Sequence, residues 1–171
     1  MRFFFLIFFL ISCSTDMDIA EFGNKKPLFV LEDYFKGKVD AWGLFYDRFG
    51  NLKRQFNVKI QGTWDGKTLI LDEKFKYDDG EQDQRIWKIT KINEQEYLGE
   101  ADDVVGKALG ISNGNALNWS YELMLTIKEK KFKVKFDDWM FLQEKGVLIN
   151  RAEISKFGIN LGIVYITFLK S

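Results

Sequence analysis

Histidine is absent from this 171-residue sequence, and cysteine and proline occur only once each. The absence of histidine removes the most frequent general base and the most frequent metal ligand of proteins. An enzyme would need a nucleophile and a base in one pocket. We therefore predict no catalytic residue, no metal site and no cofactor, and an accessory enzyme that uses carboxylates on lipids is the least favoured alternative.

An excess of charge of either sign is also missing. The 25 Lys and Arg side chains balance 25 Asp and Glu side chains, and the loss of Arg2 with a leader leaves one more acidic than basic group. Without a basic patch the chain has no electrostatic footprint for nucleic acid, so we exclude nucleic acid as a partner.

The N-terminus carries a short apolar run. Arg2 precedes nine apolar residues, Phe3 to Ile11, which end at Ser12 and Cys13. That length fits the apolar region of a signal peptide, roughly 7–15 residues, and falls short of the ~20 residues of a spanning helix. The sequence predicts a signal peptide over residues 1–12.

Cys13 is the predicted attachment point of a lipid. The tetrapeptide Leu10-Ile11-Ser12-Cys13 resembles the lipobox of bacterial lipoproteins, in which the thiol is diacylglycerylated. A lone cysteine in an exported chain would otherwise be a free thiol. The alternative is an ordinary secretory signal or a buried apolar strand with an incidental thiol. The serine after Cys13 resembles the sorting signal for the outer membrane, so we expect a lipid anchor in the bacterial cell envelope, at the periplasmic face of the outer membrane.

Residues 13–26 are expected to form a polar tether, and residues 27–171 a single domain. Pro27 and Gly37 bracket a predicted short helix. Beyond residue 39, apolar residues alternate with polar ones and turn motifs rich in Asp, Asn and Gly recur. They delimit eight strands, at 40–46, 52–64, 67–77, 82–92, 96–108, 116–127, 132–142 and 147–156. A ninth strand is possible at 159–169.

This pattern predicts an all-β fold. The absence of long helical segments between the strands excludes a parallel sheet. Consecutive hairpins with one apolar face close most economically into an antiparallel up-and-down, lipocalin-like barrel of about eight strands, because closure removes the edges. A β-sandwich is the alternative. An eight-stranded barrel is either filled by side chains or encloses one small ligand.

Several motifs follow in order along the chain: Tyr34-Phe35-Lys36-Gly37, Ala41-Trp42-Gly43, Gly62-Thr63-Trp64-Asp65-Gly66, Tyr77-Asp78-Asp79-Gly80, Asp102-Asp103-Val104-Val105-Gly106, Phe136-Asp137-Asp138-Trp139-Met140, Leu148-Ile149-Asn150-Arg151 and Ser155-Lys156-Phe157-Gly158. Together they resemble domain-of-unknown-function family 3833, a set of small bacterial lipoproteins. The resemblance implies no activity, although the tendency of family genes to lie near genes for fatty-acid modification favours a lipid ligand.

Two acidic residues fall on predicted inward faces. Glu73 shares its face with Leu71 and Phe75, and a three-residue loop would place it directly opposite Arg85. Asp138 would lie opposite Arg151 across a four-residue loop, or opposite Asn150 after a one-residue change of register. The pairs are either structural ion pairs inside the barrel or polar anchors for a ligand.

We predict a lipid-anchored binding or carrier module for a fatty-acyl or other amphiphilic ligand, with an arginine meeting an acidic headgroup. The alternative outside this class is a structural or interaction lipoprotein with a core filled by the 17 phenylalanines. A cavity above roughly 300 Å³ would favour binding. The candidate ligand-binding residues are Trp64, Glu73, Arg85, Trp87, Trp119, Tyr121, Asp138 and Arg151.

Overall fold

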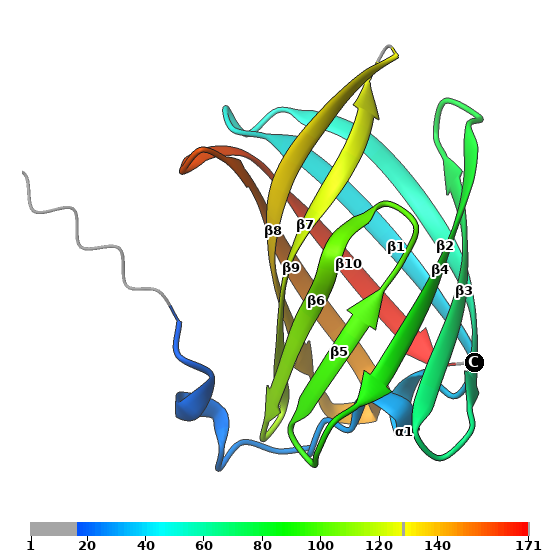
Figure 1. The fold of residues 1–171 in the computed structure, drawn as a ribbon, viewed down its shortest axis with the longest axis vertical. Coiled ribbons are helices and arrows are strands. Elements are labelled where there is room, and N and C mark those ends of the chain that lie inside the picture. The colour runs from blue at the N-terminus through cyan, green and yellow to red at the C-terminus, as the bar shows by residue number, and fades with distance from the viewer. Residues whose placement is uncertain (1–16, 128, 171) are drawn as a thin grey trace, which may run out of the picture.

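A computed structural model describes residues 17–127 and 129–170 of the chain, which fold into a closed antiparallel barrel (Figure 1). Each strand hydrogen-bonds to its neighbours in the sequence, and β1 pairs with β10 to close the sheet. The strands are β1 (Gly37–Asp47), β2 (Leu52–Trp64), β3 (Thr68–Tyr77), β4 (Gln82–Lys91), β5 (Glu96–Glu100), β6 (Val104–Asn113), β7 (Ala116–Ile127), β8 (Lys130–Leu142), β9 (Val147–Lys156) and β10 (Ile159–Lys170).

Alternation along each strand separates the core from the surface. In β2, Val58 and Ile60 are buried while Asn57 and Lys59 are exposed. Because neighbouring residues of a strand point to opposite faces, this period of two puts one apolar face inside the barrel. The predicted antiparallel up-and-down barrel is confirmed, and the β-sandwich alternative is wrong.

The number of strands differs from the prediction. The barrel has ten strands instead of about eight. The segment 96–108 was expected to be one strand, but it turns at Ala101, Asp102 and Asp103 into the hairpin of β5 and β6. That turn contains no glycine or proline, and apolar residues continue on both sides of it, so the hydrophobic pattern alone does not mark it. The ninth expected strand, 159–169, exists as β10 and closes the barrel.

A short helix, α1 (Leu31–Phe35), covers one end of the barrel (Figure 1). Pro27 precedes it by four residues instead of occupying its first position. Leu31 and Phe35 are almost completely buried. Gly62 allows the close approach, because a Cβ atom there would lie 1.8 Å from the carbonyl oxygen of Phe35. The α1 end is therefore closed.

Residues 17–26 lie against the outer wall near the β6–β7 turn. They contain the 3-10 helix η1 (Ile19–Phe22), and the ring of Phe22 packs on Trp139 and Phe141. Gly114 in that turn has a φ of +57°, and a Cβ atom there would lie 1.8 Å from the carbonyl oxygen of Phe22. No helix in the described part of the chain is both long enough and apolar enough to cross a bilayer.

The wall is interrupted near the other end. The β5–β6 hairpin stops well below the neighbouring hairpins (Figure 1). β5 pairs with β4 over residues 88–91 only, so among the described strands residues 82–87 of β4 have β3 alone as a neighbour. Residues 125–127 of β7 likewise pair only with β8. We call this interruption, between residues 82–87 and 125–127, the notch.

A candidate ligand-binding cavity

The barrel encloses a cavity of about 480 Å³ above α1. This volume lies within the range of roughly 300–1,000 Å³ that is usual for small-molecule sites. Aromatic side chains form much of its wall: Phe45, Phe56, Phe75, Trp87, Trp119 and Phe136. A smaller polar group also lines it: Arg54, Glu73, Arg85, Tyr121, Asp138 and Asn150.

Aromatic rings from strands β4, β7 and β8 contact one another across the interior. Trp87 of β4 and Trp119 of β7 are stacked with ring centroids 6.3 Å apart. Tyr121 meets Trp87 edge to face at 5.5 Å and stacks on Phe136 of β8 at 5.1 Å. Such pairs are stabilising beyond the area they bury, and they hold the rings in fixed positions. The cavity therefore has a rigid apolar wall with few polar groups.

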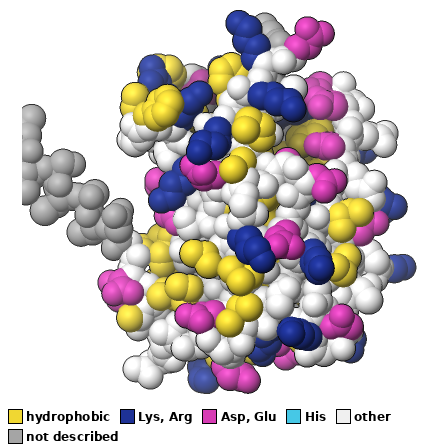
Figure 2. Space-filling view, in the orientation of Figure 1, with side chains coloured by type: hydrophobic (Ala, Val, Ile, Leu, Met, Phe, Trp, Pro, Cys, Tyr) yellow, Lys and Arg dark blue, Asp and Glu magenta, His cyan; other side chains and the backbone are white. Residues whose placement is uncertain are grey.

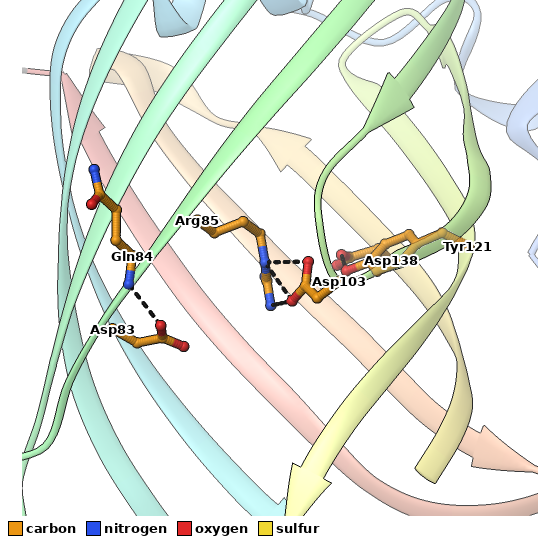
Figure 3. A network of polar contacts seen from close by, with 6 residues as sticks. All are labelled: Asp83, Gln84, Arg85, Asp103, Tyr121 and Asp138. Atoms are coloured by element: carbon orange, nitrogen blue, oxygen red, sulfur yellow. Dashed lines mark hydrogen bonds and ion pairs between the residues drawn. The ribbon is translucent and has the colours of Figure 1, made fainter. Parts of the chain in front are cut away.

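Arg85 of β4 is one of two arginines that line the cavity. Glu73 lies directly opposite it in the β3–β4 ladder, as predicted. Its partner, however, is Asp103 in the β5–β6 turn (Figure 3). Arg85 Nε donates to Asp103 Oδ2 at 3.0 Å and Nη2 donates to the same oxygen at 2.6 Å. This ion pair joins β4 to the tip of the short hairpin at the notch.

Glu73 lines the cavity without a direct partner. Within the described part of the chain it makes no hydrogen bond and no ion pair within 4.0 Å. Burial raises the pKa of this carboxyl group to about 7, and the positive charge of Arg85 offsets only part of that effect. The negative charges of Asp103 and Asp138 raise the pKa further.

Asp138 is buried, and each of its carboxylate oxygens accepts a hydrogen bond. The hydroxyl of Tyr121 donates to its Oδ2 at 3.1 Å, and the amide of Asn150 donates to its Oδ1. Burial raises the pKa of Asp138, while these two hydrogen bonds lower it. Asn150 also donates to the carbonyl oxygen of Trp139 at 3.2 Å. This group fixes the polar side of the cavity on β7, β8 and β9.

Arg54 stands at the open end of the cavity. Its Nη2 lies 2.8 Å from Asp79 Oδ2 and 2.5 Å from Glu81 Oε2. The guanidinium lies over the ring of Tyr77, 3.7 Å from its centroid. Burial would lower the pKa of Arg54, but its two acidic partners raise it. The second arginine of the cavity is therefore also paired with carboxylates.

The structure brings most of the predicted site residues to this cavity. Glu73, Arg85, Trp87, Trp119, Tyr121 and Asp138 line it. Trp64 does not, because it lies at the end of β2 and packs on the core near the closed end. The expectation that Arg151 faces the interior is wrong. Its side chain lies on the outer face of β9, where it pairs with Glu153.

The register of β8 and β9 explains the correction. Asp138 lies opposite Ala152, whereas Trp139 lies opposite Arg151 and Met140 opposite Asn150. Neither expected partner stands directly across from Asp138. Gln143 N–H donates to the Val147 carbonyl, which leaves the three residues of η2 (Glu144–Gly146) as the loop in place of four. Because side chains alternate, this odd loop length turns Arg151 outward.

Three functional candidates escaped the sequence pattern. Asp103 was assigned to a strand, and its position in a turn beside β4 follows only from the missed hairpin. Asn150 binds Asp138 from a diagonal position in the ladder, whereas the sequence considered only a position directly opposite. Arg54 lies in a strand of alternating residues, where nothing distinguishes an arginine near the rim from one on the surface. Only the turn at Ala101–Asp103 offers a signal, since two consecutive Asp residues are typical of turns.

Comparison with known proteins agrees with this description. The solved structure of the S-type phycobiliprotein lyase CpeS from Guillardia theta is similar, with a TM-score of 0.57 and 9% sequence identity. The match covers 82% of this chain and 90% of that one, and at this identity it shows the fold alone. No curated protein matches the sequence. The model of the family described as protein of unknown function DUF3833 matches residues 7–170, and the chain therefore belongs to that family.

Proposed function

We propose that this protein is a binding or carrier module that holds an amphiphilic ligand, with an apolar body such as a fatty-acyl chain, inside the barrel. The observation that carries the proposal is the cavity of about 480 Å³ with aromatic walls and a few convergent polar groups. The similarity to the phycobiliprotein lyase supports it at the level of the fold. The apolar body would lie along Trp87, Trp119 and Phe136.

A filled core is the alternative that this geometry disfavours. Ten strands enclose a wider interior than eight, because barrel diameter grows with strand number. The inward phenylalanines occupy the wall and leave space at the centre. A purely structural protein would gain stability by filling that space, since voids cost packing energy. The retained space therefore favours a ligand.

We also propose that the barrel is tethered to a membrane through a lipid on Cys13. The supporting pattern lies in residues 1–13, outside the described residues. A lipid anchor would keep a carrier beside its supply of amphiphiles. Replacement of Cys13 by Ala should yield an unprocessed or soluble species in cell fractionation. Unchanged membrane fractionation of that variant would reject the anchor without touching the binding proposal.

Binding is tested with Nile red, an uncharged apolar dye whose fluorescence rises in apolar surroundings. Ala152 lines the cavity with a small side chain, so Ala152→Phe places a ring in the space that a ligand would occupy. Thr167 on β10 is exposed on the outer face, and Thr167→Phe adds the same ring outside the barrel.

We expect the wild type and Thr167→Phe to bind Nile red alike, and Ala152→Phe to lose at least about tenfold in affinity, worth roughly 1.4 kcal/mol. Thermal unfolding checks that both variants fold. Equal binding by Ala152→Phe and Thr167→Phe would contradict the proposal, because the dye would then bind elsewhere. Absence of binding by the folded wild type would favour the structural alternative.

A further inference from the structure

We propose that the polar end of the ligand is a hydrogen-bond donor, uncharged or cationic, such as an alcohol or an amine, and that it binds the carboxyl group of Glu73. Free carboxylates then bind poorly. This inference rests on the proposed function and names the class of ligand. It also reverses the expectation that an arginine of the barrel receives an acidic headgroup.

Both arginines of the cavity already have acidic partners. Arg85 binds Asp103 in the bidentate way that is strong for a guanidinium and a carboxylate, with Nε donating to Oδ1 at 3.2 Å and Nη2 donating to Oδ2 at 2.6 Å. Arg54 lies between Asp79 and Glu81. A ligand carboxylate could reach only the remaining N–H groups of each guanidinium, whose positive charge is already balanced by the bound carboxylates. The arginines therefore offer little net attraction to an acid.

Asp138 also has partners within the protein. One of its oxygens accepts from Tyr121 and the other from Asn150. These donors come from strands β7 and β9 on both sides of it, so the carboxyl group is held by the protein itself. Asp138 thus shapes the polar side of the cavity and does not need a ligand to satisfy it.

Glu73 differs from the other charged groups of the cavity. It lines the open space, yet within the described residues no side chain or backbone group donates to it. The residue is half-buried, so its carboxyl group faces the cavity and is accessible to whatever fills that space. A donor on the ligand would supply the missing hydrogen bond. The pKa of about 7 lets Glu73 accept from a hydroxyl or pair with an ammonium group near neutral pH.

The net charge around the cavity also favours a donor or a cation over a carboxylate. Carboxyl groups that line it or pair with its arginines outnumber the two guanidiniums: Glu73, Asp79, Glu81, Asp103 and Asp138. Figure 2 shows a recess beside the short hairpin in which hydrophobic side chains lie behind acidic ones. This excess of acid repels a carboxylate and attracts a cation on its way in.

The test is a competition assay with four matched amphiphiles, dodecylamine, dodecanol, dodecanoate and methyl dodecanoate, each used below its micelle concentration. They displace Nile red from the full-length protein at about pH 8, above the pKa of Glu73 of about 7. Glu73→Gln removes the charge in place, and Asp103→Asn releases Arg85 from its partner. Glu122→Gln on the outer face, where Glu122 pairs with Lys133, is the matched control.

We expect dodecylamine and dodecanol to bind the wild type at least about tenfold more tightly than dodecanoate, since their donors meet a charged acceptor whereas dodecanoate meets a like charge. Glu73→Gln should lose that margin for dodecylamine and leave methyl dodecanoate within about twofold, while Glu122→Gln changes neither. Asp103→Asn should bind dodecanoate more tightly, because Arg85 is then free.

Tighter wild-type binding of dodecanoate than of dodecylamine would overturn the inference. So would an unchanged preference in a folded Glu73→Gln variant. The order of the wild-type affinities for the four amphiphiles tests the inference without any variant. The Asp103→Asn result tests it even if Glu73→Gln does not fold. If the wild type binds Nile red, the proposed function stands under either outcome. If the wild type does not bind Nile red, the proposed function itself is overturned.

Discussion

The barrel interior holds one glutamate at its closed end and another on the wall of its cavity, and the two differ in their hydrogen-bond partners. Glu32 of α1 lies at the closed end, where the Lys91 ammonium lies 2.7 Å from Oε1 and the Tyr97 hydroxyl donates to Oε2 at 3.0 Å. Burial alone would raise the pKa of Glu32, but these partners lower it below its ordinary value. Glu73 faces the cavity without such partners, and burial raises its pKa to about 7.

This contrast separates a structural acid from a binding acid. The protein supplies every donor that Glu32 needs, so Glu32 fixes α1 to the strands beside it. It supplies none to Glu73, whose carboxyl group remains open to the cavity. A group left unsatisfied at a cost to stability is a frequent mark of a functional site. Substitutions at each glutamate and in its surroundings test this contrast.

The largest effect is expected at the closed end. Glu32→Ala leaves Lys91 with the exposed Glu94 at 3.8 Å in place of a buried carboxylate at 2.7 Å, and should lower the free energy of unfolding by about 3 kcal/mol. Urea unfolding of the variant and the wild type measures the difference. A loss below about 1 kcal/mol would mean that Glu32 is no more structural than Glu73.

Gly62 tests the closure of the same end. A Cβ atom at Gly62 would overlap the carbonyl oxygen of Phe35, so Gly62→Ala should displace α1 and destabilise the fold by about 2 kcal/mol. The neighbouring exposed Thr63 provides the control, since Thr63→Ala should change stability by about 0.5 kcal/mol or less. Equal thermal midpoints for the two variants would contradict the close packing of α1.

Glu73→Gln should raise the free energy of unfolding, whereas the two substitutions at the closed end lower it. The folded state keeps a proton on Glu73 between pH 4.5 and about 7, where the unfolded chain has released it. Stability from this group therefore falls as the pH rises through that window. The charged groups that act on it are Arg85, Asp103, Asp138 and Asp72. Glu73→Gln should gain about 1 kcal/mol over the wild type by about pH 8.

Urea unfolding of both proteins at a series of pH values measures this difference. We expect the stability of the variant relative to the wild type to increase from about pH 4.5 to about pH 7 and then to level off. A constant difference across that range would show that Glu73 titrates normally, and the contrast with Glu32 would disappear.

The smallest effect is expected on the outer face. Arg151→Ala removes a half-exposed pair with Glu153 and should cost about 0–1 kcal/mol. It should leave the affinity for Nile red and for dodecylamine unchanged. A clear loss of binding in this variant, with folding intact, would place the ligand outside the cavity described above.

Sequence periodicity predicted the barrel and the Glu73–Arg85 register because both depend on local rules. Alternation fixes which residues face inward, and the short turn after Tyr77 fixes the opposition of the two strands. Where a loop differs by one residue the same rules fail, as for Arg151. The pairing of Arg85 with Asp103 links strands that are not hydrogen-bonded at that point, and no local pattern encodes such a contact.

A crystal structure of the protein with dodecylamine tests the role of Glu73 most directly. We predict that the alkyl chain lies against Trp87 and Trp119, that the nitrogen lies about 3 Å from a carboxylate oxygen of Glu73, and that the Arg85–Asp103 pair stays intact. A nitrogen bound at Asp79 and Glu81 at the rim, or an alkyl chain outside the barrel, would contradict it.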